Sequence, residues 1–478
     1  MKNYNLGFLL FLSLSAALGG FLFGYDEAVI SGAISDVSTQ FGLNEMMEGW
    51  FVGSALLGAI IGVLFAGALG DKAGRKKTMI LSAVLFSVSM IGSAVSGSFV
   101  ELVIYRIIGG MGIGVASIVC PLYISEISVP ERRGLLVSLY QLAVTIGVVA
   151  AYLVNHQLLE FSQSGVELSG MLHTVFVGEV WRGMMCKGVI PSLIFLIIVL
   201  FIPESPRWLI TKDKLSRAGD IFARIYNDQT EIQRQIAATK EVSAGEEKSE
   251  FKMLLKPGIL SAVIIGVCIA ILGQFMGVNA VLYYGPEIFK DAGLSSGDAL
   301  FYQVLVGLAN MLTTVVAMFI IDKVGRKALI YYGVSGMIVS LLLIAFYFSF
   351  GAELGISTVF LLTFFLLYII CCAGSICAVV WVILSEMYPI KVRGIAMSVA
   401  GLALWIGTFL IGQLTPWLLA NITPTGTFLL FAVMCIPYML IMWKLVPETT
   451  GKSLEEIEQY WTKKNNNLKI KSQWTLRN

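Results

Sequence analysis

Asp71-Lys72-Ala73-Gly74-Arg75-Lys76 is a short charged stretch between two long apolar runs, and it returns 251 residues later as Asp322-Lys323-Val324-Gly325-Arg326-Lys327. Only the third of the six positions differs, and the second copy also stands between two apolar runs. A charged stretch that recurs in this way within one chain indicates an internal repeat. The repeat predicts two structurally related halves.

Two further pairs of segments follow the same order along the chain. The first is Ser125-Glu126 with Arg133-Gly134, which returns as Ser385-Glu386 with Arg393-Gly394 at an offset of 260 residues. The second is weaker and consists of Pro203-Glu204-Ser205 and Pro447-Glu448-Thr449, at an offset of 244 residues. Three pairs of segments in the same order indicate that the chain consists of two copies of one half-molecule.

The composition indicates a membrane protein. Hydrophobic residues make up 57% of the 478 residues and charged residues only 13%, whereas a soluble domain carries about 25% charged residues. Helical spans are required, because in hydrocarbon the backbone polar groups must pair within their own segment. A span needs about 20 apolar residues, and twelve segments meet this length. The predicted spans are 7–34, 48–69, 78–97, 99–124, 134–155, 184–203, 257–289, 298–321, 328–350, 356–388, 393–419 and 424–446.

We therefore predict an all-α membrane protein with twelve transmembrane helices in two six-helix halves. The halves are expected at 1–203 and 257–446, with a polar joining segment at 204–256 and a tail at 447–478. Helical patches in the joining segment favour short cytoplasmic helices, and a partly disordered tether is the alternative. A membrane protein built from two such halves is typical of a secondary transporter with its substrate site between them.

The basic residues predict the orientation of the chain. With the N-terminus inside, 29 of the 33 Lys and Arg residues fall in inward-facing segments, in accordance with the positive-inside rule. We therefore expect both termini to be cytoplasmic and the chain to lie in the cell membrane. A long outward loop at 156–183 is expected to hold both histidines, His156 and His173, so that no histidine lies in a span. A proton carrier within the spans must then be a carboxylate.

Other function classes find little support in the sequence. The seven cysteines lie in or beside spans without metal-binding or paired spacing, so we interpret them as small apolar residues and predict no metal site. No activated nucleophile is evident, so we predict neither catalytic residues nor enzyme activity. The net charge of +2 indicates no nucleic-acid partner. The expected partners are a small molecule and the lipid bilayer.

Charged residues within spans are costly and are functional candidates by default. Asp26 lies about 12 Å and Arg106 about 10 Å inward from the outer ends of their spans at 1.5 Å per residue, so the two can pair. Pairing keeps Asp26 ionised, and breaking the pair allows proton uptake, which would couple transport to protons. The alternative is a static ion pair that fixes helix packing. Glu27 is either a second acid on a polar path or a residue pointing to the outer interface.

Polar and aromatic side chains in otherwise apolar spans are candidate substrate ligands. Amides donate and accept hydrogen bonds, which matches hydroxyl groups, and tryptophans offer flat faces to a sugar ring. A lone interior tryptophan can instead serve packing alone. The predicted substrate-binding residues are Gln141, Gln274, Asn279, Tyr283, Trp381 and Trp405.

The repeated charged residues lie at the inward ends of predicted helices. Such a set can hold the two halves together on the inside and release them when the protein opens inward. Simple positive-inside anchoring is the alternative, but anchoring requires no carboxylates. The predicted cytoplasmic gate comprises Asp71, Arg75, Glu126, Arg133, Glu204, Arg207, Asp322, Arg326, Glu386, Arg393 and Glu448.

The chain resembles the sugar porter branch of the major facilitator superfamily, in particular bacterial D-xylose–proton symporters and mammalian glucose facilitators. The resemblance extends from the first span to about Gln459. It rests on Gly24-Tyr25-Asp26, the turn from Gly70 to Lys76, Arg106-Ile-Ile-Gly-Gly110, Pro203-Glu-Ser-Pro-Arg207, Asn279-Ala-Val-Leu-Tyr-Tyr284 and Pro447-Glu-Thr-Thr-Gly451.

This resemblance implies the major facilitator fold and monosaccharide transport by alternating access. It also implies that Gln141, Gln274, Asn279 and Trp381 contact the sugar. Proton-driven members have an aspartate at the position of Asp26, which favours symport.

Three positions depart from the family pattern. Gly273 replaces the first of two consecutive glutamines, Leu404 replaces an amide before the tryptophan of the eleventh span, and Cys377-Ala378 replaces Gly-Pro. Each lost amide removes a hydrogen bond to a sugar hydroxyl worth about 0.5–1.5 kcal/mol. We therefore expect a sugar that is smaller, less hydroxylated or differently oriented than glucose.

These observations predict a proton-coupled symporter of a pentose or hexose that acts as a monomer, with the proton as coupling ion and no cofactor. A facilitator of a sugar or of a polyol such as inositol is the first alternative. A sugar sensor without transport is the second, although the joining segment and tail leave little room for a signalling domain.

Overall fold

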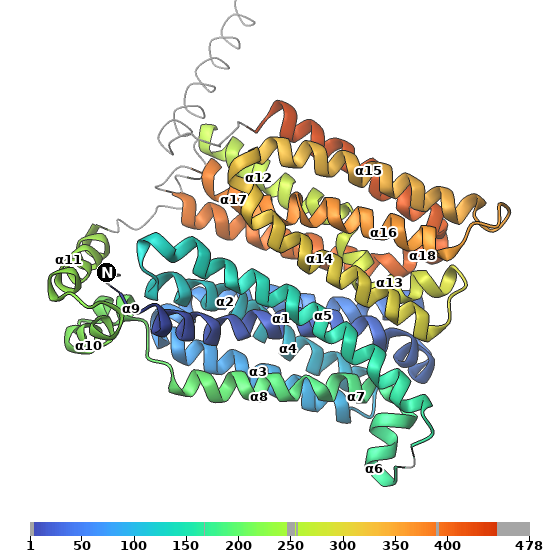
Figure 1. The fold of residues 1–478 in the computed structure, drawn as a ribbon, viewed down its shortest axis with the longest axis horizontal. Helices are drawn as coiled ribbons and strands as arrows, with labels where there is room; N and C mark the ends of the chain where they lie inside the picture. The colour runs from blue at the N-terminus through green and yellow to red at the C-terminus, as the bar shows by residue number, and fades with distance from the viewer. Residues whose placement is uncertain (1–3, 167, 246–253, 255–256, 389–391, 447–478) are drawn as a thin grey trace, which may run out of the picture. The chain divides into compact units, whose positions relative to one another are not determined.

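Helices form the regular structure of the described residues, apart from one isolated β-bridge between Tyr4 and Tyr226 (Figure 1). The structure, a computed structural model, describes residues 4–166, 168–245, 254, 257–388 and 392–446. Eleven helices in these ranges are long and apolar enough to cross a membrane. One of them, α18 (Arg393–Lys444), is broken at Thr423, where φ is 66°, and covers two predicted spans. The prediction of an all-α membrane protein is confirmed, and α18 accounts for the difference between eleven helices and twelve spans.

The chain divides into two compact units. Unit 1 consists of Met1–Glu246, Leu282–Met311 and Gly412–Pro416. Unit 2 consists of Glu247–Val281, Leu312–Ile411 and Trp417–Asn478. Unit 1 thus contains the predicted first half together with segments from the second. The predicted boundaries of the two halves stay a prediction.

Unit 1 is built on long apolar helices. They are α1 (Leu6–Phe41), α2 (Glu45–Ala73), α3 (Arg75–Val95), α4 (Phe99–Ile127) and α5 (Arg133–Gln163). Shorter elements follow or connect them: η1 (Pro130–Arg132), α6 (Gly170–His173), η2 (Thr174–Gly178), α7 (Val180–Lys187) and α8 (Val189–Phe201). Residues 282–311 come from α13 (Val278–Asp291) and α14 (Ser296–Val324). α1 packs against α5 and α4, α2 packs against α4, and α3 packs against α4 and α8.

Small residues allow the helices of unit 1 to approach closely. A Cβ atom on Gly24 of α1 would lie 1.9 Å from the carbonyl oxygen of Val144 on α5. A Cβ atom on Gly110 of α4 would lie 1.9 Å from the carbonyl oxygen of Ala55 on α2. Glycine at such contacts is the usual means of close packing between membrane helices. These contacts hold α1 close to α5 and hold α4, which carries Arg106, close to α2, and α1 also packs against α4.

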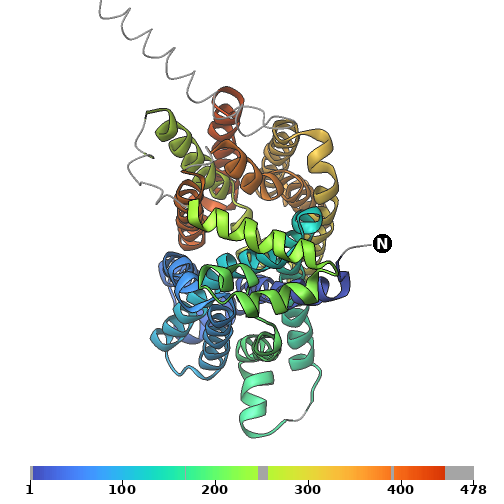
Figure 2. The same ribbon diagram turned by 90° about the vertical axis from the view of Figure 1, so that its left-hand side faces the viewer.

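Three helices follow the sixth apolar span. They are α9 (Pro206–Thr211), α10 (Leu215–Ile225) and α11 (Gln229–Gly245). They lie together at one end of unit 1, which faces the viewer in Figure 2, whereas α6 lies at the opposite end (Figure 1). The backbone N–H of Asn5 donates to the carbonyl of Ile225 (2.8 Å), which joins the start of α1 to α10. The described part of the joining segment is therefore largely helical, and its side of the membrane stays a prediction.

Unit 2 contains two predicted spans that are interrupted. Its helices are α12 (Pro257–Phe275), α15 (Arg326–Phe350), α16 (Thr358–Ala373), α17 (Ile376–Met387) and most of α18, with the first residues of α13 and the last of α14. The span predicted at 257–289 breaks at Gly277, which has a φ of 90° that favours glycine. The span predicted at 356–388 breaks at Gly374 and Ser375. Broken helices expose backbone groups in a membrane only where protein or a cavity can satisfy them.

His156 lies on a helix rather than in a loop, which corrects the sequence prediction. α5 continues through it, and α6, η2 and α7 occupy much of the region predicted as a loop at 156–183. The helix continues because residues 156–163 contain no glycine or proline that would end it. Asn155 Nδ2 donates to the Val29 carbonyl on α1 (3.1 Å), and His156 Nε2 lies 3.6 Å from Glu160 Oε1. The helix that contains His156 is long and apolar enough to cross a membrane, and the prediction that no histidine lies within a span stays a prediction.

Candidate functional site

Asp26 and Arg106 form a buried ion pair between α1 and α4. Arg106 Nη1 lies 3.1 Å from Asp26 Oδ1, and the two side chains are 3% and 1% exposed. The guanidinium carbon lies 5.9 Å from the ring centroid of Phe51 on α2. Asp26 Oδ2 and Arg106 Nε have no hydrogen-bond partner among the described residues. A buried pair stabilises a fold only when its remaining polar atoms are satisfied, so this pair is poorly arranged for a purely structural role.

Glu27 faces α13 rather than an outer interface. The hydroxyl of Tyr283 donates to Glu27 Oε1 at 3.2 Å, although the two residues are 256 positions apart. Tyr283 is itself buried. The structure thus favours the interpretation that Glu27 is an acid on an interior face of α1, at about 100° around the helix from Asp26.

Other hydrogen bonds fix the same part of α13 within unit 1. The Tyr152 hydroxyl on α5 donates to the Leu282 carbonyl at 2.7 Å, and Gln303 Nε2 on α14 donates to the same carbonyl at 3.1 Å. The Tyr284 hydroxyl donates to the Gly412 carbonyl at 2.6 Å. Tyr283 therefore belongs to a segment that is held by several side chains.

The remaining predicted ligand of unit 1, Gln141, is exposed on α5. In unit 2, Asn279 Nδ2 donates to Gln274 Oε1 at 2.7 Å, across the break between α12 and α13. A Cβ atom on Gly407 of α18 would lie 3.2 Å from Gln274, so α18 passes close to this amide pair. The structure thus brings two of the predicted amides into contact.

The two predicted tryptophans differ in exposure. Trp381 on α17 is 42% exposed, and its indole lies 3.5 Å from the position of a Cβ atom on Gly401 of α18. Trp405 on α18 is buried. An exposed aromatic face is available for stacking, whereas a buried one already makes packing contacts. Trp381 is accordingly the stronger candidate for a ring contact.

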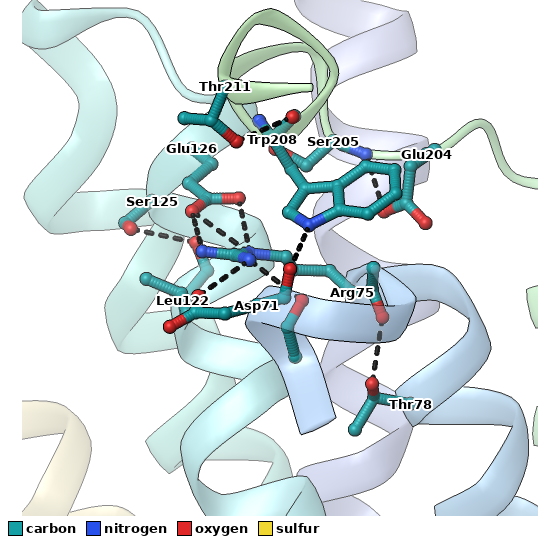
Figure 3. A network of polar contacts seen from close by, with 12 residues as sticks. Asp71, Arg75, Thr78, Leu122, Ser125, Glu126, Glu204, Ser205, Trp208 and Thr211 are labelled. Carbon is teal, nitrogen blue, oxygen red and sulfur yellow. Dashed lines mark hydrogen bonds and ion pairs between the residues drawn. The ribbon is translucent and has the colours of Figure 1, made fainter. Parts of the chain in front are cut away.

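The first copy of the repeated motif forms a hydrogen-bonded network around Arg75 (Figure 3). Its Nε donates to both carboxylate oxygens of Glu126 on α4 at 3.1 Å, and Nη2 donates to Oε1 at 2.9 Å. Nη1 donates to Asp71 Oδ1 at 3.0 Å and to the Gly70 carbonyl at 2.8 Å. The planar guanidinium suits this forked arrangement, which a lysine could not reproduce. The network connects α2, α3 and α4.

Glu204 binds the N-terminus of α3 instead of forming an ion pair among the described residues. Its Oε1 accepts hydrogen bonds from the backbone N–H groups of Lys76 (3.1 Å) and Ser205 (2.8 Å). A carboxylate at this position satisfies unpaired N–H groups and complements the helix dipole. A Cβ atom on Gly74 would lie 2.2 Å from Glu204 Oε2, and Gly74 has a φ of 95°. The backbone conformation therefore favours glycine, and a side chain here would also displace the Glu204 carboxylate from its position.

Arg133 and Arg207 carry charge near this network without an ion-pair partner in the described part of the chain. The Nε atom of each is buried and lacks a hydrogen-bond partner there. Burial lowers the pKa of Arg207 and the neighbouring Arg133 guanidinium lowers it further, while Glu126 acts in the opposite direction. The two positively charged guanidinium groups therefore lie close to each other. Within the described ranges, each keeps an Nε donor free for a hydrogen-bond acceptor.

The second copy repeats the local structure in unit 2. Arg326 Nη2 lies 3.1 Å from Glu386 Oε1, and the corresponding distance from Arg75 Nη2 to Glu126 Oε1 in the first copy is 2.9 Å. Gly325 has a φ of 94° and precedes α15 as Gly74 precedes α3. Arg393 Nε and Nη2 both lie 3.4 Å from the Tyr388 carbonyl oxygen. The Asp322 side chain and Glu448 lie outside what the structure describes.

Sequence reasoning missed two residues of the first network. Trp208 Nε1 donates to the Asp71 carbonyl at 2.9 Å and joins α9 to the end of α2 (Figure 3). Gly74 provides the space for Glu204. The signal for Gly74 was present, because the glycine recurs as Gly325 in the repeat. Nothing in the sequence around Trp208 indicates its partner Asp71, because Asp71 lies 137 residues away in the chain.

A family model described as sugar (and other) transporter matches residues 12–461. The arabinose-proton symporter of Bacillus subtilis is 38% identical over 462 residues, which cover 97% of this chain and 97% of that protein. The D-xylose-proton symporter of Escherichia coli is 35% identical, in an alignment that covers 96% of this chain and 97% of that protein.

Solved structures agree with these similarities. The inward open conformation of the xylose transporter XylE from E. coli matches with a TM-score of 0.81 and 32% identity, over 95% of this chain and 100% of that chain. XylE bound to 6-bromo-6-deoxy-D-glucose, described as a major facilitator superfamily proton:xylose symporter, matches with a TM-score of 0.77 and 34% identity, over 96% and 100%. The predicted resemblance and the major facilitator fold are confirmed. The chain belongs to the sugar (and other) transporter family and is a multi-span membrane protein.

Proposed function

We propose that the protein is a proton-coupled symporter of a pentose or hexose that works by alternating access. The observation that carries this proposal is the buried pair of Asp26 and Arg106, in which one carboxylate oxygen has no partner among the described residues. Relatives named as arabinose-proton and D-xylose-proton symporters support it. Proton is the proposed coupling ion.

The pair can exchange one proton without other chemistry. While Asp26 is ionised, the Arg106 guanidinium compensates its charge. When Asp26 takes up a proton, the attraction to Arg106 is lost, and the contact between α1 and α4 changes. A proton that binds from one side and leaves to the other then drives the sugar with it, because an intramembrane carboxylate of this kind is the usual proton carrier in transporters.

The sugar ligands are proposed to be Gln141, Gln274, Asn279, Tyr283, Trp381 and Trp405. The hydrogen bond between Asn279 and Gln274 supports this role, because each amide keeps the other oriented and retains capacity for sugar hydroxyls. Both lie beside the helix break at Gly277, where a polar ligand can reach backbone groups as well.

The inner gate is proposed to consist of the two Arg–Glu networks and the charged residues around them. Arg75 with Glu126 and Arg326 with Glu386 are the observed pairs. Arg133 and Arg207 lack partners in the described ranges, so they are the residues we expect to change partners during the cycle. In this proposal both termini are cytoplasmic, and the functional form in the cell membrane is a monomer.

The test is uptake of D-xylose, L-arabinose, D-glucose and myo-inositol into proteoliposomes, with and without an inward proton gradient. We expect one pentose or hexose to accumulate above its external concentration only with the gradient. Uptake that equilibrates and ignores the gradient would identify a facilitator, and inositol uptake alone would identify a polyol carrier. Binding without uptake would identify a sensor and reject transport.

A further inference from the structure

Two consecutive carboxylates on α1 face different helices. Asp26 contacts Arg106 on α4, and Glu27 contacts Tyr283 on α13. The ion pair gives Asp26 a cation, whereas the described contacts give Glu27 only a neutral hydroxyl. An intramembrane carboxylate without a cation is costly to keep ionised, and such residues are found where protons or substrates pass.

Glu27 also differs from Asp26 in access. Asp26 is buried, whereas the Glu27 side chain is partly exposed. Within the described residues, the Tyr283 hydroxyl is the only group that donates a hydrogen bond to Glu27, and it occupies Oε1. The titratable or charged groups around Glu27 are Asp26 on its own helix, Arg106 on α4, Tyr140 and Tyr152 on α5 and Tyr283 on α13. The Arg106 charge is already shared with Asp26, so no cation is dedicated to Glu27.

The hydrogen bond from Tyr283 to Glu27 differs from the other bonds that hold α13, because its acceptor is a carboxylate. Tyr152 and Gln303 donate to the Leu282 carbonyl, and Tyr284 donates to the Gly412 carbonyl. Backbone carbonyls do not titrate, so these three bonds are the same at every pH. The bond from Tyr283 to Glu27 is the one whose acceptor can bind a proton. Hydrogen bonds to an ionised acceptor are about twice as strong as those to a neutral one.

From this geometry we propose that Glu27 is a second proton-binding carboxylate of the transport cycle, and that its proton uptake weakens the Tyr283 bond and loosens α13 from α1. The step adds one proton to the carboxylate, removes one negative charge from α1 and leaves the tyrosine hydroxyl intact. This inference rests on the proposed function, since a second coupled proton requires proton-coupled transport. It predicts two protons per sugar, one at Asp26 and one at Glu27.

The number of protons per sugar is measured in proteoliposomes from the accumulation ratio at a fixed pH gradient with the membrane voltage held at zero. With a gradient of one pH unit, each coupled proton contributes about tenfold to the limiting ratio. We expect about a hundredfold for the wild type and about tenfold for Glu27→Gln, which keeps an acceptor for Tyr283 but binds no proton. Glu353→Gln, at an exposed position in the loop after α15, is the matched control and keeps the wild-type ratio.

Hydrogen exchange of α13 in lipid nanodiscs tests the loosening directly, at about pH 5.5 and about pH 8. Wild-type residues 282–291 should exchange faster at the lower pH after correction for the intrinsic rate. In Tyr283→Phe, the amides of residues 282–291 should exchange fast at both pH values, because the bond to Glu27 is absent. In Glu27→Gln, their exchange rate should not depend on pH.

The outcomes separate the two proposals. A wild type that does not respond to the gradient rejects the proposed symport. A wild type that is coupled to one proton, or a Glu27→Gln variant with the wild-type ratio, overturns the role of Glu27 and leaves symport through Asp26 intact. A difference in exchange that persists in Tyr283→Phe also overturns the role of Glu27.

Discussion

Asp26 sits in a part of the chain where a charge without compensation would be strongly unfavourable, and Arg106 provides that compensation within 3.1 Å. The sequence predicts this pairing, because both residues lie about 10–12 Å inward from the outer ends of their spans and therefore at similar depths in the membrane. The hydrogen bond of Glu27 does not follow in this way. Its direction depends on the rotation of α1 against α13, which no local pattern specifies.

Asp26→Asn is expected to lower the limiting accumulation ratio about tenfold at a gradient of one pH unit while leaving sugar exchange across the membrane. The amide has the shape of the carboxylate but takes up no proton, so the sugar loses the proton coupled at Asp26 and keeps only the one at Glu27. Counterflow of labelled sugar in proteoliposomes measures exchange, and uptake with a proton gradient measures accumulation. Glu353→Gln serves as the control. If Asp26→Asn accumulates sugar as the wild type does, proton binding lies elsewhere.

At the scale of elements, the ends of helices determine how the charged motif works. α3 begins at Arg75 without a side-chain cap from its own N-cap residue, Gly74. Glu204 supplies the missing acceptor from 128 positions away. The arrangement favours a glycine because its φ of 95° strains any other residue, and because a side chain there would displace the Glu204 carboxylate.

Gly74→Ala is therefore expected to destabilise the protein by about 1–3 kcal/mol, the usual cost of a strained backbone position. Gly325→Ala should have a similar effect, because Gly325 has a φ of 94°. Gly134→Ala is the matched control, since a Cβ atom there meets nothing within 4 Å and the residue is helical. Thermal unfolding in detergent measures all three. Equal melting temperatures for Gly74→Ala and Gly134→Ala would contradict the role of Gly74.

Glu179, just before α7, is expected to contribute to the stability of the folded protein in a pH-dependent way. Burial opposes its charged form, but hydrogen bonds from Arg182 and Gln40 and the Arg182 charge outweigh this effect and lower the pKa of Glu179. A carboxyl whose pKa is lowered in the folded state stabilises the protein above its ordinary value of 4.5. This contribution is lost as the pH falls below that value.

We therefore expect Glu179→Gln to melt at a lower temperature than the wild type at neutral pH, with the difference shrinking below pH 4.5. Melting curves of both proteins across this range provide the measurement. Glu353→Gln should show no such convergence. A difference that is the same at neutral and acidic pH would mean that the charge of Glu179 is not its source.

At the scale of the molecule, α6 and the group α9–α11 lie at opposite ends of unit 1 (Figure 1). The proposed orientation places α6 outside the cell and α9–α11 inside. In a variant without the seven native cysteines, a membrane-impermeant thiol reagent applied to intact cells should label Leu172→Cys on α6 and not Lys212→Cys after α9. Labelling of both after membrane permeabilisation is the control. Labelling of Lys212→Cys in intact cells would mean that α9–α11 lie outside the cell, and would contradict the proposed orientation.

The sequence by itself determined the membrane class, the helical content, the repeat and the family, because hydropathy and short charged motifs are properties of contiguous residues. It also placed Asp26 and Arg106 at one depth. The break at Gly277 and the helical position of His156 were not predicted, because hydropathy does not determine where a helix within an apolar segment breaks or where it ends.

Only the tertiary structure decided which groups meet. It paired Arg75 with Glu126, bound Glu204 to the start of α3 and directed Glu27 to Tyr283, across 51, 128 and 256 positions. Hydropathy determines that a helix spans the membrane, but its rotation and register determine which side chains it presents to a neighbour. Those are set by close packing at residues such as Gly24 and Gly110, and therefore by the fold as a whole.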